Sequence, residues 1–511
     1  MFLIASIVIF ISLFFVLYVF FKTQFSYWSR YKTVPSVAGR IFSGNFWDFL
    51  KFKTNFAYHL KSIYDDPKFA DTSVVGVYGL YKPCLLIREP ELIKSVLVRD
   101  FDSFHNRFGE MDVNNDPVGA HAMFFASYPI WKEMRTKLSP LFTSVKMKNT
   151  YQLIRIVAEN LNCHLNRQLS VYRVEMKDFC ARYMTDIVAT TLLGFQSNCL
   201  DQPTEALNNQ IRKLSDFSSR RAFNFLIACF VPKLAWIFGS KLIYPENEKY
   251  FRQIIPQAIA ERESSGKNRS DLIDFLVKVK EDTKKLGKYF MECLVGQAAV
   301  FIVGGFETSS STMSNALLEL AKNPDIQKKL KQNISSTFSK ASTEGVTYED
   351  INKLEYLDMI ISETLRLYPV FPVLERVYNK PPNKMEPYNL RPFCDYTLPD
   401  GMSVFISTYG INYDPKYWPN PTKFDPERFS AENYSYSNSA IYLPFGMGPR
   451  NCIGMRLGIM QVKCGLLYLL KDHHVRICED TVLQPEFDAK SIVLQIKGGI
   501  NLEIVRDEVL Y

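Results

Sequence analysis

The stretch Phe445-Gly-Met-Gly-Pro-Arg450-Asn-Cys452-Ile-Gly454 lies near the C-terminal end of a 511-residue chain and is its most informative segment. Glycine on both sides of Cys452 lets the loop backbone lie close to a flat partner, because no Cβ intervenes. Arg450 is placed to pair with a carboxylate of that partner, and Phe445 can pack beside the sulfur and exclude water. The pattern predicts a thiolate bound to the iron of a planar cofactor, a ligand that favours O–O cleavage.

This stretch resembles the haem-binding loop of the cytochrome P-450 superfamily, FxxGxRxCxG, at all five fixed positions. The resemblance implies that Cys452 is the axial ligand of the iron and that the cofactor is haem b. The other loop residues that would contact the haem are Phe445, Gly446, Gly448, Arg450 and Gly454. For Cys452 alone, a structural cysteine in a glycine-rich turn is the alternative.

A second motif falls within residues 286–321, which read as one long helix. Gly304, Gly305, Phe306, Glu307 and Thr308 follow one another near its middle. Two glycines inside a helix cost about 1 kcal/mol each relative to alanine, so we expect them to make room for a flat cofactor or dioxygen. The stretch resembles the family's [A/G]GxxT motif, which implies that Thr308 and Glu307 are the catalytic pair that guides protons to dioxygen. Close helix packing, with the threonine bonded back to its own helix, is the alternative.

Two further stretches resemble the family's ExxR and PERF segments. Glu363 and Arg366 are three residues apart in an apolar helical context, where they share a face. Arg428 lies in the sequence Phe-Asp-Pro-Glu-Arg-Phe. The resemblance implies a structural triad of these three residues behind the haem. A surface ion pair of Glu363 and Arg366, which would stabilise little, is the alternative.

Four more residues match positions that contact haem propionates in the family. Trp131 and Arg135 are four residues apart, so on a helix they share a face that suits a carboxylate. Arg107, in FHNRFG, and Arg376, in LERV, match two further contacts of animal microsomal members. A single arginine in an ordinary surface position is the alternative for each of the last two.

By the same resemblance, apolar residues from four segments would line the substrate pocket. They are Phe108, Met111, Met123, Phe124, Phe301, Ile302, Gly305, Val370, Leu374 and Ile492. Ordinary core packing is the alternative for each of them. Residues 222–244 combine apolar side chains with Lys233 and Lys241 and follow directly on Arg220 and Arg221. We interpret this region as a surface that dips into a bilayer where lipophilic substrates arrive, and ordinary core helices are the alternative.

Residues 2–21, FLIASIVIFISLFFVLYVFF, carry no charge and are long enough to cross the roughly 30 Å apolar layer as a helix. A cleaved signal peptide, the alternative, would have a basic start and a shorter apolar run. Lys22, Arg30 and Lys32 follow the segment, so the positive-inside rule leaves the rest of the chain cytosolic. Ten scattered cysteines without a CxxC pair also favour a reducing compartment.

Hydrophobic residues make up 47% of the chain, which supports a large buried core. Strand patterns occur at 73–78, 84–88, 396–407 and 491–505, and helical patterns at 150–168, 174–194, 248–263 and 286–321. This order predicts a mainly α fold with smaller sheets (α+β) and not a βαβ alternation. The predicted domains are a transmembrane signal-anchor (1–21), a linker (22–45) and a haem-thiolate catalytic domain (46–511).

The resemblance spans residues 30–505 and looks most like insect microsomal members that oxidise xenobiotics or endogenous lipids. It implies a monooxygenase at the endoplasmic reticulum membrane that inserts one atom of O₂ into a lipophilic substrate. Because no dinucleotide or flavin motif is present, electrons would come from NADPH through a flavoprotein reductase, with cytochrome b5 as a second candidate donor. A reductase-independent isomerase or dehydratase and a non-catalytic haem or lipid binder are the alternatives. The net charge of +8 is modest, and no basic, aromatic-rich block indicates nucleic acid, so we expect no nucleic-acid partner.

Overall fold

The structure is a computed structural model that describes residues 2–508 apart from 41–42, 205, 215–217, 267–268, 270, 284–289, 342, 344, 434–439 and 492. The chain forms two compact units. Unit 1 contains Met1–Phe108, Phe371–Pro421 and Tyr436–Asn451, and unit 2 contains Gly109–Val370, Thr422–Ser435 and Cys452–Tyr511.

Unit 1 is built on a four-stranded sheet with strand order β1-β2-β5-β4. The β2 and β5 strands are parallel, whereas the pairs β1/β2 and β4/β5 are antiparallel. The strands are β1 (Val74–Gly79), β2 (Lys82–Ile87), β4 (Val373–Val377) and β5 (Ser403–Ser407). The helices are α1 (Phe2–Phe25), α2 (Trp47–Leu50), α3 (Phe56–Tyr64), α4 (Pro90–Lys94) and α17 (Thr408–Asn412). β1 and β5 are buried along their whole length, so this sheet is a core element.

The segment after α1 is packed on β1 of the same unit. Trp28 is 2% exposed, and its indole N–H donates to the carbonyl of Val77 at 3.0 Å. The hydroxyl of Tyr78 donates to the carbonyl of Phe25 at 2.8 Å, and Val37 N–H donates to Gly76 O at 2.9 Å. The predicted linker 22–45 is therefore tied to β1 at several of its positions.

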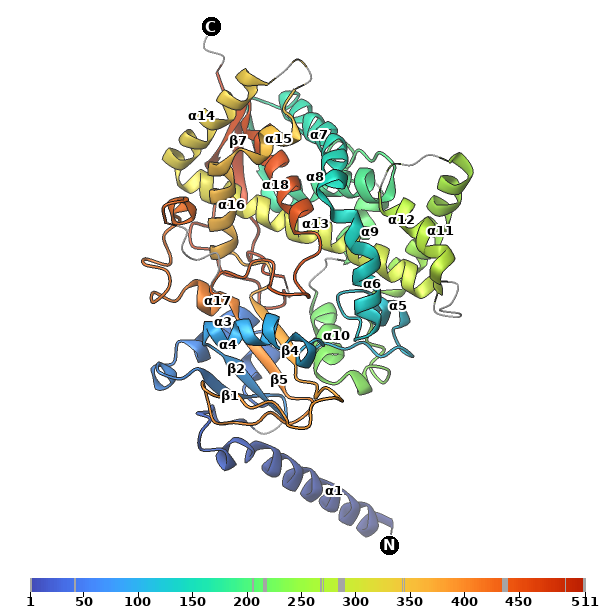
Figure 1. Cartoon of the computed structure of the whole chain (residues 1–511), viewed down its shortest axis with the longest axis vertical. Helices are drawn as coiled ribbons and strands as arrows, with labels where there is room; N and C mark the ends of the chain where they lie inside the picture. The colour runs from blue at the N-terminus through green and yellow to red at the C-terminus, as the bar shows by residue number, and fades with distance from the viewer. Residues whose placement is uncertain are drawn as a thin grey trace. The chain divides into compact units, whose positions relative to one another are not determined.

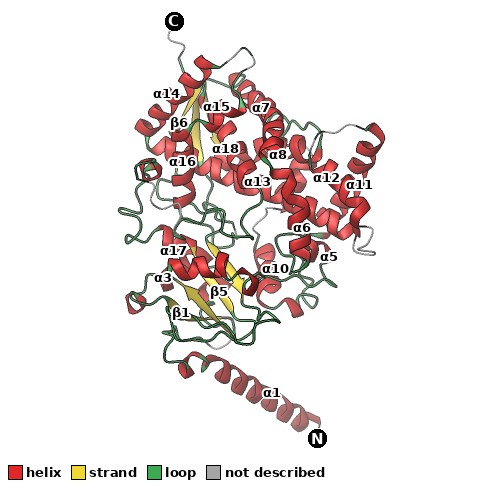
Figure 2. Ribbon diagram, in the orientation of Figure 1, coloured by secondary structure: helices red, strands yellow, loops and turns green. Residues whose placement is uncertain are grey.

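Unit 2 is mainly helical, as Figure 2 shows, and carries a three-stranded antiparallel sheet with the order β3-β7-β6. Its strands are β3 (Val171–Glu175), β6 (His473–Ile477) and β7 (Asn501–Arg506). Its helices are α5 (Pro117–His121), α6 (Ile130–Leu138), α7 (Ser144–Asn166), α8 (Met176–Val188), α9 (Ala206–Leu214), α10 (Ser219–Phe230), α11 (Pro245–Ser265), α12 (Leu272–Thr283), α13 (Phe290–Lys322), α14 (Pro324–Lys340), α15 (Tyr348–Asn352), α16 (Glu355–Leu367) and α18 (Met455–Leu470).

The 33-residue helix α13 runs through unit 2 and packs against α8, α18, α5 and α16 (Figure 1). Its second half is almost wholly buried, from Ser309 to Ala321. A central helix covered on several sides buries much apolar area, which is the main favourable term in folding. The prediction of a mainly α fold with smaller sheets is confirmed.

The predicted elements differ from the observed ones mainly at strand ends. The pattern at 396–407 yields only β5, because Pro399 and Gly401, with φ of 80°, form a turn before it. The pattern at 491–505 likewise yields only β7, after Gly498 and Gly499 with φ of 83° and 81°. These left-handed backbone positions interrupt a strand whatever the apolar pattern around them.

Candidate haem-thiolate site

The loop that leads to Cys452 contains two tight turns in unit 1. Gly446 N–H donates to Leu443 O at 3.1 Å, and Asn451 N–H donates to Gly448 O at 3.0 Å. Gly448 has a φ of 73°, and a Cβ there would lie 1.9 Å from the carbonyl oxygen of Leu97. Position 448 therefore requires glycine because the loop backbone approaches the backbone of Leu97 closely. The sequence pattern did not indicate this reason.

Arg450 lies in this loop with its side chain held in place. It is 5% exposed, and its Nε donates to the carbonyl of His105 at 2.9 Å. Phe445, one turn earlier in the loop, is half-buried. The guanidinium is thus anchored through Nε, the nitrogen nearest the chain.

Two more predicted arginines lie together in unit 1. Arg107 Nη1 is 3.2 and 3.3 Å from the two carboxylate oxygens of Glu375 on β4, and Arg376 Nη1 donates to the backbone carbonyl of Glu375 at 2.6 Å. Arg376 is 1% exposed, and burial, followed by the charge of Arg107, lowers its pKa to about 9. One guanidinium group contacts the Glu375 carboxylate and the other contacts its backbone carbonyl, so a further carboxylate would stabilise both cations.

In unit 2, Cys452 is the exposed thiol that immediately precedes the turn into α18. Trp131 is 5% exposed on α6, and Arg135 follows it one turn later. Burial lowers the pKa of the Arg135 guanidinium, and the charge of Cys452 opposes that shift. The structure therefore brings the predicted axial ligand and the predicted propionate contacts of α6 into one neighbourhood.

The start of α18 is connected to α13 through one aromatic ring. A Cβ at Gly454 would meet only the ring of Phe142, at 3.9 Å, and that ring is stacked on Phe301 of α13 with centroids 5.8 Å apart. Phe301 precedes Gly304 by three residues, so the two lie on adjacent turns of one helix face. The cysteine turn and the glycine segment of α13 thus belong to the same part of unit 2.

The two glycines of α13 have different surroundings. A Cβ at Gly304 would meet no described atom within 4 Å, whereas a Cβ at Gly305 would lie 3.5 Å from Val188 of α8. Thr308 Oγ1 donates to Gly304 O at 2.6 Å and therefore shares the open face. The hydrogen bond from Thr308 back to its own helix, which was the alternative to a catalytic role, is therefore present. However, the Thr308 side chain lies on the face of α13 where Gly304 leaves open space. Gly305, which was predicted to line the substrate pocket, faces α8.

Glu307 has quite different partners from its neighbour Thr308. It is 3% exposed, pairs with Lys177 of α8 at 2.9 Å and accepts from Gln495 Nε2 at 2.6 Å. No hydrogen bond joins its carboxylate to Thr308 within the described part of the chain. Lys177 and Gln495 could not be predicted as partners of Glu307, because neither belongs to a recognisable motif.

The predicted triad is assembled as a buried network in unit 2. Arg366 and Glu363 are fully buried and form a bidentate pair, with Nε and Nη2 at 2.7 and 2.8 Å from the two carboxylate oxygens. Arg428 Nε is 3.3 Å from Glu363, and Asp425 N–H donates to the same carboxylate at 2.9 Å. Arg366 also donates to the carbonyl of Lys423 at 3.3 Å. The surface-pair alternative is therefore wrong.

The residues predicted to line the substrate pocket lie in both units. Phe108 and Leu374 belong to unit 1, where the ring of Phe108 lies 5.3 Å from that of Phe405. In unit 2, the residues with little exposure are Met111, Met123, Phe301, Ile302 and Val370, and Phe124 is half-buried. Ile492 lies outside the described residues. The role of these side chains stays a prediction.

Two contacts connect predicted pocket segments within unit 2. Gln297 of α13 accepts from Met123 N–H at 3.2 Å, which ties the segment after α5 to α13. Leu494 N–H donates to Val370 O at 3.1 Å, which joins the chain after α16 to the C-terminal segment. Gln297 was not predicted, since a single glutamine in a helix carries no spacing signal.

Comparison with known proteins gives full-length matches. Residues 45–502 match the family profile described as Cytochrome P450. The chain is 38% identical over 501 residues to "Probable cytochrome P450 6v1" of Drosophila melanogaster, covering 95% of this chain and 96% of the relative. It is 35% identical over 520 residues to "Cytochrome P450 6k1" of Blattella germanica, covering 98% and 97%.

The fold, the site and these matches define a haem-dependent monooxygenase, an oxidoreductase that uses O₂, a redox partner and a lipophilic substrate. The chain belongs to the cytochrome P450 family.

The residues present fit the haem that the family implies. Cys452 offers an exposed sulfur, and a Cβ at Gly304 would enter open space. The buried Nε of Arg376 makes no hydrogen bond to any described residue, which suits an additional carboxylate. A haem propionate would supply the acceptor that this one nitrogen lacks among the described residues.

Proposed function

We propose that the chain is a membrane-bound monooxygenase that holds haem b through Cys452 and inserts one atom of O₂ into a xenobiotic or an endogenous lipid or hormone. The observation that supports this most is the arrangement of unit 2. There the exposed Cys452 thiol lies near Arg135, and Phe142 connects the start of α18 to the glycine segment of α13. These residues would supply a thiolate ligand for the iron, a cation for a propionate and a helix face without side chains.

The bound haem would supply oxygen activation, and the chain's residues would control its surroundings. Arg376, whose buried Nε makes no hydrogen bond to a described residue, would hold a propionate together with the neighbouring Arg107. Trp131 and Arg135 would do so from α6. Thr308, on the open face of α13, would pass a proton to dioxygen from its hydroxyl.

Electrons would come from NADPH through a flavoprotein reductase, with cytochrome b5 as a second donor. The membrane attachment rests on α1. Of the described helices, two are long and apolar enough to span a bilayer. The first, Ile4–Phe25, has a mean hydropathy of 2.8 in its most apolar stretch, and none of that stretch is buried. In the second, Glu292–Lys322, 67% of the most apolar stretch is buried inside the protein. The first is the candidate anchor, and the basic residues after it would keep both units on the cytosolic side of the endoplasmic reticulum.

The test is oxidation of NADPH by the full chain reconstituted with purified reductase, measured with and without candidate lipophilic substrates. A monooxygenase forms an oxygenated product only when reductase and NADPH are both present. An isomerase or dehydratase would convert a peroxide or alcohol substrate without the reductase. Product formation that is independent of the reductase would overturn the proposal.

Thr308→Ala is expected to keep haem and substrate binding but to lower the product formed per NADPH roughly tenfold, since a general acid contributes at least this much. The reducing equivalents should appear as hydrogen peroxide. Thr312→Ala is the matched control, because Thr312 makes the same bond to the carbonyl four residues earlier, at 2.9 Å. If Thr308→Ala and Thr312→Ala form the same amount of product per NADPH, Thr308 has no role in proton transfer.

The predicted membrane surface at 222–244 is only partly exposed. Leu226 and Phe230 are buried, whereas Trp236, Ile237 and Phe238 are 65%, 56% and 51% exposed. A contiguous exposed apolar group is typical of a membrane or partner contact. We therefore assign the proposed bilayer contact to 236–238 and not to Phe230.

Removal of residues 1–21 is expected to leave haem content intact, while the shortened protein still co-sediments with anionic liposomes through 236–238. Trp236→Asp and Phe238→Asp should each weaken that binding roughly tenfold, as one large apolar side chain is withdrawn from the bilayer. Val145→Asp is the control, because Val145 is 73% exposed on α7, outside this surface. If Val145→Asp weakens binding as much, the effect is one of charge and the assignment is wrong.

A further inference from the structure

Helices α13 and α18 meet along a tight seam in unit 2. A Cβ at Gly465 of α18 would lie 2.6 Å from Sδ of Met313 on α13 and 2.7 Å from Cε1 of Tyr183 on α8, so a side chain there would displace both. Gly458 lies two helical turns earlier on α18. A Cβ at Gly458 would lie 3.6 Å from Oγ of Ser309, which is an ordinary contact. The two helices are therefore in close contact from Ser309 to Met313.

One hydrogen bond joins the two helices within this seam. Ser309 Oγ donates to Gln461 Oε1 at 3.1 Å, and the two residues are 3% and 0% exposed. Among the residues that the structure describes, it is the one hydrogen bond between α13 and α18. The hydroxyl of the buried Tyr183 donates to the backbone carbonyl of Gln461 at 3.5 Å, so α8 contacts α18 at the same residue.

The side-chain amide of Gln461 is only half satisfied. Its Nε2 is buried and makes no hydrogen bond to any described residue. An unpaired buried donor destabilises a fold, whereas a methionine of similar length would fill the same space without that loss. Stability alone therefore does not favour glutamine at position 461, and its contact with Ser309 is the feature that a methionine could not provide.

This hydrogen bond lies between the cysteine turn and the glycine segment of α13. Gln461 follows Cys452 by nine residues, on the helix that begins directly after the cysteine turn. Ser309 follows Gly304 by five residues, which at 1.5 Å per residue is about 7.5 Å along the helix axis. The contact thus connects α18 to α13 less than two helical turns from the glycine segment.

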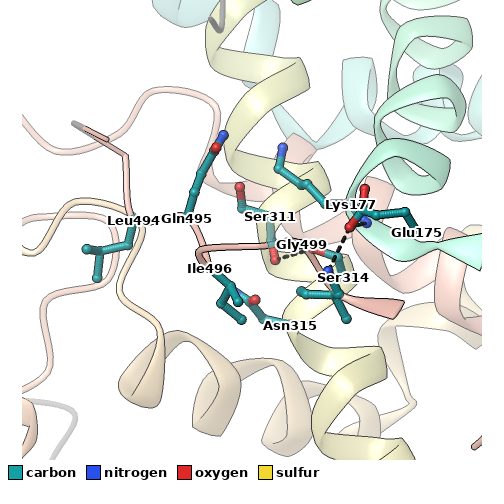
Figure 3. A pocket seen from close by; sticks show the side chains of 10 residues that line it. Glu175, Lys177, Ser311, Ser314, Asn315, Leu494, Gln495, Ile496 and Gly499 are labelled. Carbon is teal, nitrogen blue, oxygen red and sulfur yellow. Dashed lines mark hydrogen bonds between the residues drawn. The ribbon is translucent and has the colours of Figure 1, made fainter. Parts of the chain in front are cut away.

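The face of α13 opposite Ser309 borders a cavity. At about 100° per residue, Ser311, Ser314 and Asn315 lie roughly 140–240° around the helix from Ser309. These three residues line a space of about 200 Å³ together with residues of the segment 494–500 (Figure 3). A cavity offers fewer packing contacts than a filled interface. Packing on that face therefore restrains α13 less than the seam with α18 does.

We propose that Gln461 is a positioning residue that holds α13, through Ser309, at a fixed distance from the helix of Cys452, and that it thereby limits the size of the group that can bind the iron on the side of Gly304. The inference rests on the proposed function, because it takes Cys452 as the iron ligand. A group that needs more room must displace the glycine segment, and that displacement would break the hydrogen bond at Ser309. Selectivity for size would then depend in part on a contact outside the predicted pocket.

The test compares a small and a bulky nitrogen ligand of the iron, imidazole and 4-phenylimidazole, in Soret titrations of the haem-loaded full chain. In Gln461→Met, 4-phenylimidazole should gain roughly fivefold in affinity relative to imidazole, because one neutral hydrogen bond, worth about this factor, no longer opposes displacement of α13. Lys463→Met is the matched control, since Lys463 is 2% exposed on α18 but pairs with Asp358 of α16 at 2.8 Å. An unchanged ratio of affinities in Gln461→Met, or an equal change in Lys463→Met, would overturn the proposal.

Ser309→Ala removes the other half of the contact with a smaller change in shape, and it carries the test if Gln461→Met does not hold haem. It should change the ratio of affinities as Gln461→Met does, and the double variant should change it no further, because both substitutions remove one hydrogen bond. Ser314→Ala is its control, since Ser314 is 1% exposed and donates to the carbonyl of Ser311 in its own helix at 3.1 Å. Additive effects in the double variant would show that Ser309 and Gln461 act independently, and the proposal would be wrong.

Amide hydrogen exchange gives a readout that needs neither an added ligand nor turnover. In Gln461→Met and Ser309→Ala, the amides of residues 301–309 should exchange roughly fivefold faster, whereas those of residues 316–321 should exchange as in the wild type. Wild-type rates at 301–309 in both variants would show that the contact does not restrain α13. A wild-type protein without the red-shifted carbonyl band would contradict the proposed function, while hydrogen exchange would still decide whether Gln461 holds α13.

Discussion

Cys452→Ser is expected to abolish the red-shifted Soret band of the reduced carbonyl complex and to lower turnover by several orders of magnitude. The band requires a thiolate opposite the carbonyl ligand, and a serine hydroxyl stays protonated and donates far less electron density to the iron. The measurement is a reduced-plus-carbon-monoxide difference spectrum of the purified protein, followed by product formation with reductase.

Cys163→Ser is the control for this result, since Cys163 is the other exposed cysteine of the described chain and lies on α7. It should leave both the spectrum and turnover unchanged. A surviving red-shifted band in Cys452→Ser would mean that another residue ligates the iron, and the assignment of the loop would be wrong.

Glu363→Ala is expected to cost about 3–5 kcal/mol of folding free energy, the usual loss when one member of a buried ion pair is removed. The carboxylate binds Arg366 through both oxygens and also accepts from Arg428 and from the Asp425 backbone. Its removal leaves Arg366 buried without a counter-charge. Since total stability is only about 5–15 kcal/mol, most of the chain should lose haem or fail to accumulate.

Glu427→Ala tests whether this effect is specific to burial. Glu427 forms an ion pair with Lys329 at 2.6 Å, but both side chains are about half exposed, at 50% and 53%. Such a pair contributes about 0–1 kcal/mol. Haem content and the urea midpoint should therefore be near wild type in Glu427→Ala and greatly reduced in Glu363→Ala. Equal values for the two variants would show that the triad is not a stabilising centre.

The residues with the most predictable positions are those whose partners lie close in the sequence. Glu363 and Arg366 meet because residues three apart share a helix face, and Thr308 bonds to Gly304 for the same reason. The long apolar patterns predicted α7, α8, α11 and α13 with bounds that differ from the observed ones by up to six residues, and the predicted positions 286–289 lie outside the described residues. Strand ends were less predictable, because Gly401, Gly498 and Gly499 adopt backbone angles that the apolar pattern does not record.

Burial within an apolar segment could not be predicted from composition. Residues 222–244 are mostly apolar, yet Phe230 is 6% exposed and Trp236 is 65% exposed. α10 ends at Phe230 with its apolar face turned inward, and the turn that follows leaves 236–238 uncovered. Gly305 is a similar case, since only the packing of α8 shows that it faces Val188 rather than the open face of α13.

Residue type and short spacing were enough to predict the kind of site, because a cysteine in a glycine-rich loop, a glycine pair in a helix and an ExxR pair are all local patterns. Which groups surround these residues depends on the tertiary packing. Gln495 reaches Glu307 across 188 positions of the chain, and Gly448 is required by the carbonyl of Leu97. Such contacts depend on how whole helices and segments pack, and many weak interactions together determine that packing. A local sequence pattern therefore does not predict them.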